Sequence, residues 1–132
     1  MKTLAYSSTP LANKLGIRDG FVICLVNPPA YYFDLFEDMP VNIQILTDSK
    51  TTKKLIHYST KQADDVRRDI LSLKQEISHN GMIWIPWPKK ASKVTTDITE
   101  DVIRDLALSN GLVDIKVCSI DQIRSALNWS YR

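Results

Sequence analysis

The segment Trp84-Ile85-Pro86-Trp87-Pro88-Lys89-Lys90 holds the residues best suited to binding a ligand. Indole faces next to ammonium groups suit a planar anion, a nucleotide or single-stranded nucleic acid. Asn27, which ends an apolar run, would add both a donor and an acceptor. The competing interpretation, which we favour, is that the tryptophans fill the core and the lysines are solvated. If a ligand binds, we expect it to contact Asn27, Trp84, Trp87, Lys89 and Lys90.

The turn after the first apolar run argues against a cofactor bound in the usual way. In a dinucleotide-binding Rossmann domain this turn is rich in glycine, so that backbone amides approach a phosphate or a methionine-derived cofactor closely. Here the turn reads Asn27-Pro28-Pro29-Ala30. It has no glycine, and its two prolines lack the N–H groups that such a ligand needs. We therefore expect no cofactor and interpret the prolines as a rigid end to the strand.

Other chemistries find little support in the residue types. Two Cys and two His, far apart in the chain, do not supply the four ligands of a structural zinc site, so we expect no metal. Cys24 and Cys118 lie in apolar runs and are expected as buried, unpaired thiols. No Gly-x-Ser-x-Gly motif exposes a nucleophile, and Ser59 is interpreted as a cap or turn residue. Asp97 and Asp101 are expected to stabilise a helix start rather than hold a metal.

The charge and hydropathy of the sequence do not favour binding to a polyanion or insertion into a membrane. Seventeen Lys and Arg face fifteen Asp and Glu, and the net charge of +2 is spread along the 132 residues. No long-range field attracts nucleic acid, which we rank third among partners. No apolar stretch reaches the roughly 18 residues of a membrane-spanning helix. We expect one cytoplasmic α/β domain over residues 1–132.

Apolar patterning predicts the elements that would position these residues. The continuous apolar runs 21–26 and 82–87 are typical of parallel strands covered on both faces, with prolines 86 and 88 marking where pairing must fail. Apolar residues at steps of three and four predict a helix over 61–78, ended by Asn80-Gly81. A second helix is expected over 98–109, with Asp97 and Glu100 as a capping pair. A short helix is expected over 10–15, and strands over 41–46, 54–59, 113–117 and 126–131.

Strands separated by helices predict right-handed crossovers and a mainly parallel sheet in three layers, closed by an antiparallel C-terminal hairpin. The order strand, helix, strand, helix and two strands resembles the second half of a Rossmann-like methyltransferase domain. The alternative is an α+β domain with a mainly antiparallel sheet, which would follow if 41–46 and 54–59 formed a hairpin.

The chain also resembles an uncharacterised bacterial family, a domain of unknown function. The shared residues are Thr9-Pro10-Leu11, Lys14-Leu15-Gly16-Ile17, Asn27-Pro28-Pro29, Gly81 to Lys89 with both tryptophans, and Gly111 to Cys118. They extend over nearly the whole chain. Where members of that family have Trp-Ser after the last of these motifs, this chain has Arg124-Ser125. The resemblance implies a cytosolic bacterial protein and assigns no activity.

Two functions follow as hypotheses. The first is a non-catalytic binding or interaction module, favoured because the chain lacks a recognisable set of acid, base, nucleophile or metal ligands. Its partner would be a protein, or a second copy that pairs with the edge of the C-terminal hairpin. The alternative is a degenerate Rossmann-like enzyme or sensor that binds a nucleotide or small anion at the carboxyl ends of the strands.

Overall fold

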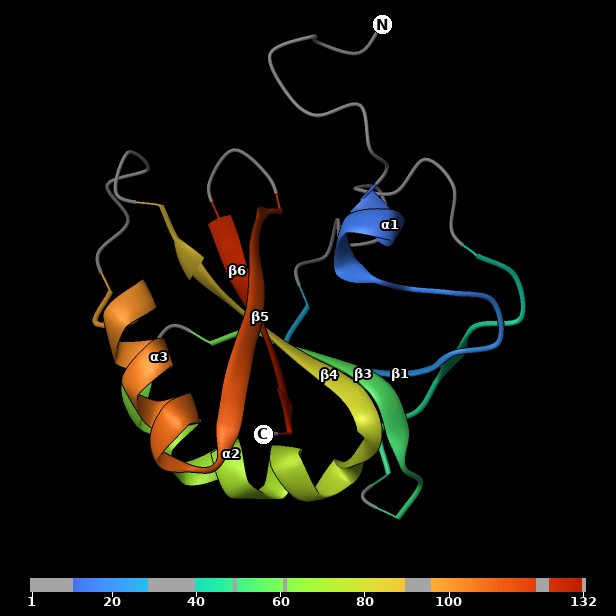
Figure 1. The fold of residues 1–132 in the computed structure, drawn as a ribbon, viewed down its shortest axis with the longest axis horizontal. Helices are drawn as coiled ribbons and strands as arrows, with labels where there is room; N and C mark the ends of the chain where they lie inside the picture. The colour runs from blue at the N-terminus through green and yellow to red at the C-terminus, as the bar shows by residue number, and fades with distance from the viewer. Residues whose placement is uncertain are drawn as a thin grey trace, which may run out of the picture.

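A computed structural model describes residues 11–28, 40–48, 50–60, 62–89, 96–120 and 124–131. Their strands form one six-stranded sheet in the order β2-β1-β3-β4-β6-β5 (Figure 1). The strands are β1 (Val22–Val26), β2 (Gln44–Ile45), β3 (Lys53–Tyr58), β4 (Ile77–Pro88), β5 (Leu112–Ser119) and β6 (Arg124–Tyr131). The helices are α1 (Leu11–Leu15), α2 (Ala63–Glu76) and α3 (Glu100–Ser109).

The four strands β2, β1, β3 and β4 are parallel, and β6 pairs antiparallel with both β4 and β5. The expected α/β fold, with a mainly parallel sheet and an antiparallel C-terminal hairpin, is therefore confirmed. The antiparallel alternative is wrong, because β2 and β3 do not form a hairpin; each pairs in parallel with β1, which lies between them. The strand expected over 41–46 shortens to two exposed residues at the sheet edge.

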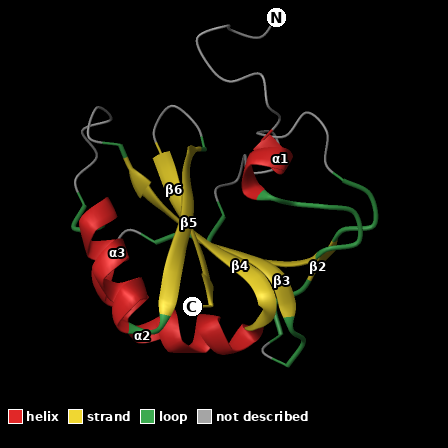
Figure 2. Ribbon diagram, viewed as in Figure 1, coloured by secondary structure: helices red, strands yellow, loops and turns green. Residues whose placement is uncertain are grey.

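Helices cover both faces of the sheet. α2 and α3 pack on one face over Ile56 and Tyr58, whereas α1 packs on the other face over Leu55 (Figure 2). β3 is buried from both sides, because it lies between β1 and β4 within the sheet and between the two layers of helix. Cys24 of β1 is buried and free, as expected; the side chain of Cys118 lies outside the described residues.

The α2 helix is shorter than its apolar spacing predicted. It ends at Glu76, and Ile77 already has an extended backbone, with ψ 150°, and pairs with Lys53 of β3. Asn80-Gly81 therefore lies inside β4 rather than at the helix end. β3 advances two residues from Lys53 to Leu55 while β4 advances five from Ile77 to Met82. Burial of Ile77 against the sheet thus takes precedence over one further turn of helix, and β4 accommodates the extra residues as a bulge.

The prolines of β4 do not end its pairing, which corrects the sequence prediction. Pro86 lies opposite Ala126 and Pro88 opposite Arg124 in the antiparallel ladder with β6. The parallel ladder with β3 ends at the pair His57–Trp84, so among the described strands this part of β4 has a partner on one side only. At every second residue of this part of β4, the N–H points away from β6. A proline at one of these residues therefore removes no hydrogen bond of the ladder.

A buried ion pair connects the start of β3 to the end of α2. Lys53 is fully buried, and its Nζ lies 2.8 Å from Oε1 of Glu76. The same ammonium group donates to the backbone oxygen of Asp48 and lies 3.8 Å from the Asp48 carboxylate. A buried ammonium group needs such partners, because its hydration is lost. Lys53 therefore joins the loop after β2, the strand β3 and the helix α2.

We expect Lys53→Ala to lower the free energy of unfolding by about 3 kcal/mol, because it leaves Glu76 without its buried partner. The matched control is Lys54→Ala on the same strand, which removes a hydrogen bond to the exposed Asn80 and is expected to cost less than about 1 kcal/mol. Urea denaturation of both variants measures the difference. Equal losses would show that the buried pair contributes no more than a surface contact.

Candidate functional site

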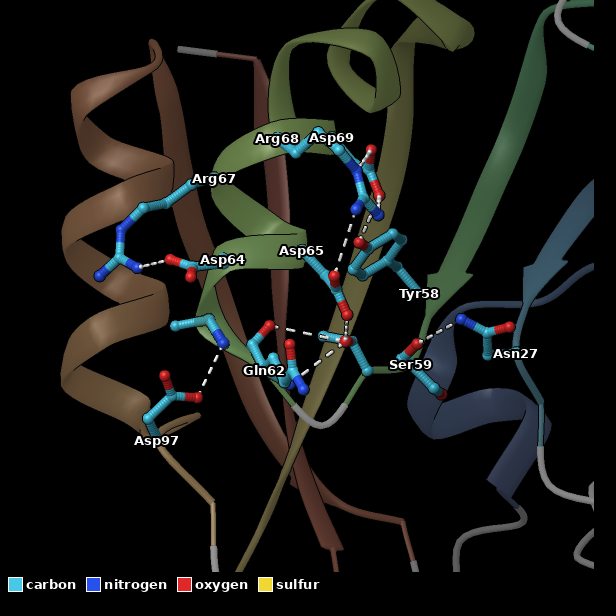
Figure 3. Close-up of polar contacts among 12 residues, drawn as sticks. Asn27, Tyr58, Ser59, Gln62, Asp64, Asp65, Arg67, Arg68, Asp69 and Asp97 are labelled. Atoms are coloured by element: carbon cyan, nitrogen blue, oxygen red, sulfur yellow. Dashed lines mark hydrogen bonds and ion pairs between the residues drawn. The ribbon is translucent and has the colours of Figure 1, made fainter.

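The carboxyl ends of β1 and β3 lie side by side and are held together by hydrogen bonds. Val26 pairs with Tyr58, and the N–H of Ser59 donates to the Val26 oxygen at 3.0 Å. The next residue of β1, Asn27, has φ 52°, a left-handed conformation that Asn adopts more readily than most residues. The side-chain Nδ2 of Asn27 donates to the backbone carbonyl oxygen of Ser59 at 3.3 Å (Figure 3). Asn27 thus ties the two strand ends together with its side chain.

Ser59 carries a buried hydroxyl that is unsatisfied. The residue is 7% exposed, and its Oγ has no hydrogen-bond partner among the described parts of the chain. An unpaired buried hydroxyl costs about 1–3 kcal/mol, and a ligand that supplies a donor or an acceptor removes that cost. Ser59 stands where open α/β sheets bind their ligands, just beyond the carboxyl end of a parallel strand.

A polar cluster lies on the α2 side of the same edge. The Tyr58 hydroxyl donates to Oδ2 of Asp69 at 2.6 Å, and the Arg68 Nε donates to Oδ1 at 2.9 Å (Figure 3). The hydrogen bond from Arg68 holds the pKa of Asp69 below its ordinary value, and the bond from Tyr58 acts in the same direction. Burial, followed by the hydrogen bond to Asp69, raises the pKa of Tyr58 well above 10. Tyr58 therefore acts as a donor and not as a base at neutral pH.

The start of α2 is occupied by an aspartate from a distant part of the chain. Oδ1 of Asp97 accepts a hydrogen bond from the N–H of Ala63 at 2.8 Å. This corrects the prediction that Asp97 caps the helix over 98–109. That helix begins at Glu100, and its cap is Thr99, whose hydroxyl accepts from the N–H of Val102. The spacing to Glu100 suggested a local cap, but tertiary packing brings Asp97 to another helix.

The structure places the five candidate ligand-binding residues in different surroundings. Asn27 is exposed at the edge beside Ser59. Trp84 is fully buried on the α1 side, where its Nε1 donates to the Leu15 oxygen at 2.8 Å, and Trp87 is buried on the opposite face. Lys89 directly follows the end of β4. Lys90 lies outside the described residues.

The two indoles are therefore not brought together, whereas Asn27 and Ser59 are. Sequence reasoning did not select Ser59, because a serine after a strand resembles an ordinary turn residue. The signal that marks it is its position directly after β3, a strand buried along both faces.

The described residues show neither a cluster of metal ligands nor a membrane-spanning helix. No group of three His, Cys, Asp or Glu side chains there is arranged to hold a metal ion. No helix among these residues is both long and apolar enough to cross a membrane.

No protein-family model matches this sequence, and no curated protein does either. Solved structures do match. A type 11 methyltransferase described as putative, from Sulfolobus solfataricus, superposes with a TM-score of 0.63 at 13% identity, covering 92% of this chain and 89% of that one. A SAM-dependent methyltransferase from Aquifex aeolicus gives a TM-score of 0.60 at 11% identity, covering 90% and 86%. The fibrillarin pre-rRNA processing protein of Methanococcus jannaschii gives 0.58 at 11% identity, covering 86% and 67%.

The chain has a Rossmann-like methyltransferase fold. The expected resemblance to a Rossmann-like methyltransferase is confirmed for the fold, and it extends beyond half of such a protein, since 89% of the Sulfolobus chain is aligned. The expectation of a non-catalytic binding or interaction module is corrected by the same finding, because the structural neighbours are methyltransferases. At this level of identity the likeness shows the fold alone.

We expect Trp84→Ala to cost about 3–5 kcal/mol of unfolding free energy, because a fully buried indole and its hydrogen bond to Leu15 are lost. Trp84→Phe keeps an aromatic ring and is expected to cost less. Leu71→Ala, at an exposed position of α2, is the control and is expected to leave stability nearly unchanged. Chemical denaturation decides, and a negligible loss in Trp84→Ala would contradict a packing role.

We expect Asp69 to make the stability of the folded protein fall as the pH becomes acidic. Its pKa in the folded protein is lowered, so its contribution is present above the unfolded value of about 3.9 and is lost as pH falls through the folded value. Wild-type protein should therefore lose more stability than Asp69→Asn as pH falls below about 4. Denaturation midpoints across this range measure the effect. Parallel curves for the two proteins would contradict it.

Proposed function

We propose that this chain binds a small molecule of the nucleoside or nucleotide class at the carboxyl ends of β1 and β3. The observation that carries the proposal is the buried Ser59 hydroxyl, which has no partner in the described chain and lies beside Asn27. Buried polar groups in folded proteins are normally satisfied, and an exception calls for a specific explanation, of which a bound molecule is one. The methyltransferase fold supports the same location, since ligands of open α/β sheets lie beyond the carboxyl ends of the strands.

S-adenosyl compounds are the first ligands to test, because several structural neighbours are SAM-dependent methyltransferases. The residues present fit one half of such a cofactor. A ribose or base edge offers a partner to the Ser59 hydroxyl, and the Asn27 side chain beside it has both donor and acceptor groups. The turn at Asn27-Pro28 does not fit the amino-acid half, because Pro28 has no N–H to offer a carboxylate. We therefore derive no methyl-transfer step for this chain.

Two further expectations from the sequence belong to this proposal. The motifs from Lys14-Leu15-Gly16-Ile17 to Gly111–Cys118 support membership of an uncharacterised bacterial family. A location in the cytoplasm stays a prediction from the sequence. A small anionic ligand near Lys89 and Lys90 stays a prediction that the ligand panel below tests.

The test is a thermal-shift panel of adenosine, nucleotides, nicotinamide cofactors, S-adenosylmethionine and S-adenosylhomocysteine. A ligand present at 100 times its dissociation constant stabilises the folded state by about 2.7 kcal/mol and raises the melting temperature accordingly. No shift with any compound would overturn the proposal.

Ser59→Ala tests the residue that carries the proposal. It is expected to weaken the affinity for a panel ligand by about 3–10-fold, the loss of one hydrogen bond, while leaving the stability of the free protein unchanged or higher. Ser72→Ala, at an exposed position of α2, is the matched control and should change neither quantity. Lower stability of Ser59→Ala at unchanged affinity would assign the hydroxyl a purely structural role.

A further inference from the structure

At two described places along this edge, a backbone N–H that would hold an anionic group is either missing or already donates to the protein. The turn after β1 is one such place in Rossmann-like folds, where successive N–H groups cradle a phosphate. In this chain Pro28 and Pro29 have no N–H, and the side-chain amide of Asn27 donates to the backbone oxygen of Ser59. These two prolines therefore offer no backbone donor to an anion.

The second place is the N-terminus of α2, which follows β3 and carries the partial positive charge of a helix start. The N–H of Ala63 donates to the Asp97 carboxylate at 2.8 Å, and the N–H of Gln62 donates to the Thr60 hydroxyl at 3.3 Å. The Thr60 hydroxyl in turn donates to the carboxylate of Asp65. The Asp97 carboxylate thus takes the first N–H of the helix, which a phosphate would otherwise use (Figure 3).

The charges around this edge also repel anions. Four described carboxylates lie on the first half of α2 and at its contact with Asp97, against two guanidinium groups, Arg67 and Arg68. Arg67 pairs with Asp64 at 2.5 Å, and Arg68 pairs with Asp69 at 2.9 Å and Asp65 at 3.4 Å. The four are Asp64, Asp65, Asp69 and Asp97. Lys89, the described cation that follows β4, already takes part in an interaction with the protein.

We infer that this edge selects an uncharged nucleoside over the corresponding nucleotide. The inference rests on the proposed function and specifies its ligand. Ser59 and Asn27 supply hydrogen-bonding groups for hydroxyls and base edges. A phosphate instead meets prolines at 28 and 29, an Ala63 N–H that already donates to Asp97 and, among the described residues of α2 and its cap, more carboxylates than guanidinium groups. Binding of a nucleotide would bring its negatively charged phosphate close to these carboxylates, and repulsion between like charges weakens binding.

The experiment measures the affinity of the whole chain for adenosine and for AMP by isothermal titration calorimetry. Adenosine should bind at least about tenfold more tightly than AMP, equivalent to about 1.4 kcal/mol. Added salt should narrow this ratio, because it screens the repulsion of the phosphate. AMP binding as tightly as adenosine would overturn the inference and leave the proposed function standing. If neither adenosine nor AMP binds, and no other member of the ligand panel binds, both the inference and the proposed function are overturned.

Asp97→Asn tests the closed helix start directly. It keeps a side-chain oxygen near Ala63 but removes one negative charge, so AMP affinity should rise several-fold while adenosine affinity stays the same. Asp101→Asn, at an exposed position in the first turn of α3, is the control and should leave the ratio unchanged. Circular dichroism checks that both variants fold. If Asp97→Asn does not fold, the salt dependence in the wild type decides, and a ratio unaffected by salt would contradict the inference.

Discussion

The burial of β3 on both faces is the constraint on which the rest of this structure depends. Leu55 and Ile56 point to opposite sides of the sheet, and both are fully buried, one beneath α1 and the other beneath α2 and α3. A strand in this position needs a parallel neighbour on each side and a cover on each face, which β1, β4 and the two helical layers provide. The carboxyl ends of β1 and β3 meet at one edge as a consequence.

Polar groups at both ends of β3 have to be satisfied because the strand is buried. At its start, the Lys53 ammonium group is neutralised by Glu76 at the end of α2. At its end, the Tyr58 hydroxyl donates to Asp69 in the middle of the same helix. These two contacts fix α2 along the strand. Ser59 is the exception in this series, since no described group reaches its hydroxyl.

A methyltransferase fold and an unusual turn after β1 coexist in this chain without contradiction. The fold is set by apolar burial, strand order and crossovers, and these survive at 13% identity to a solved relative. Ligand preference is set by a few groups at the strand ends. Replacing a glycine-rich turn with Asn27-Pro28 leaves the sheet intact and changes what the edge can hold. Function therefore has to be argued from this edge.

Much of the architecture was determined by the sequence alone. The apolar runs at 21–26 and 82–87 cannot be exposed to water, so they predict buried strands, and the alternation over 113–117 predicts the hairpin that β5 and β6 form. Local patterns do not predict the structure where a contact with a distant residue outweighs the local preference. The spacing of Ile77 predicts the last turn of a helix, and only its pairing with β3 makes it a strand residue.

The candidate site divides in the same way. Asn27 could be selected from sequence, because it directly follows an apolar strand that predicts a carboxyl end. Trp84 and Trp87 could not be assigned to core or ligand, since that depends on the faces against which β4 packs. Ser59 and Asp97 became informative only in the folded chain, because a missing partner and a helix start 34 residues away are tertiary facts. Residue types thus determined which groups were available, and packing decided which of them remained unsatisfied.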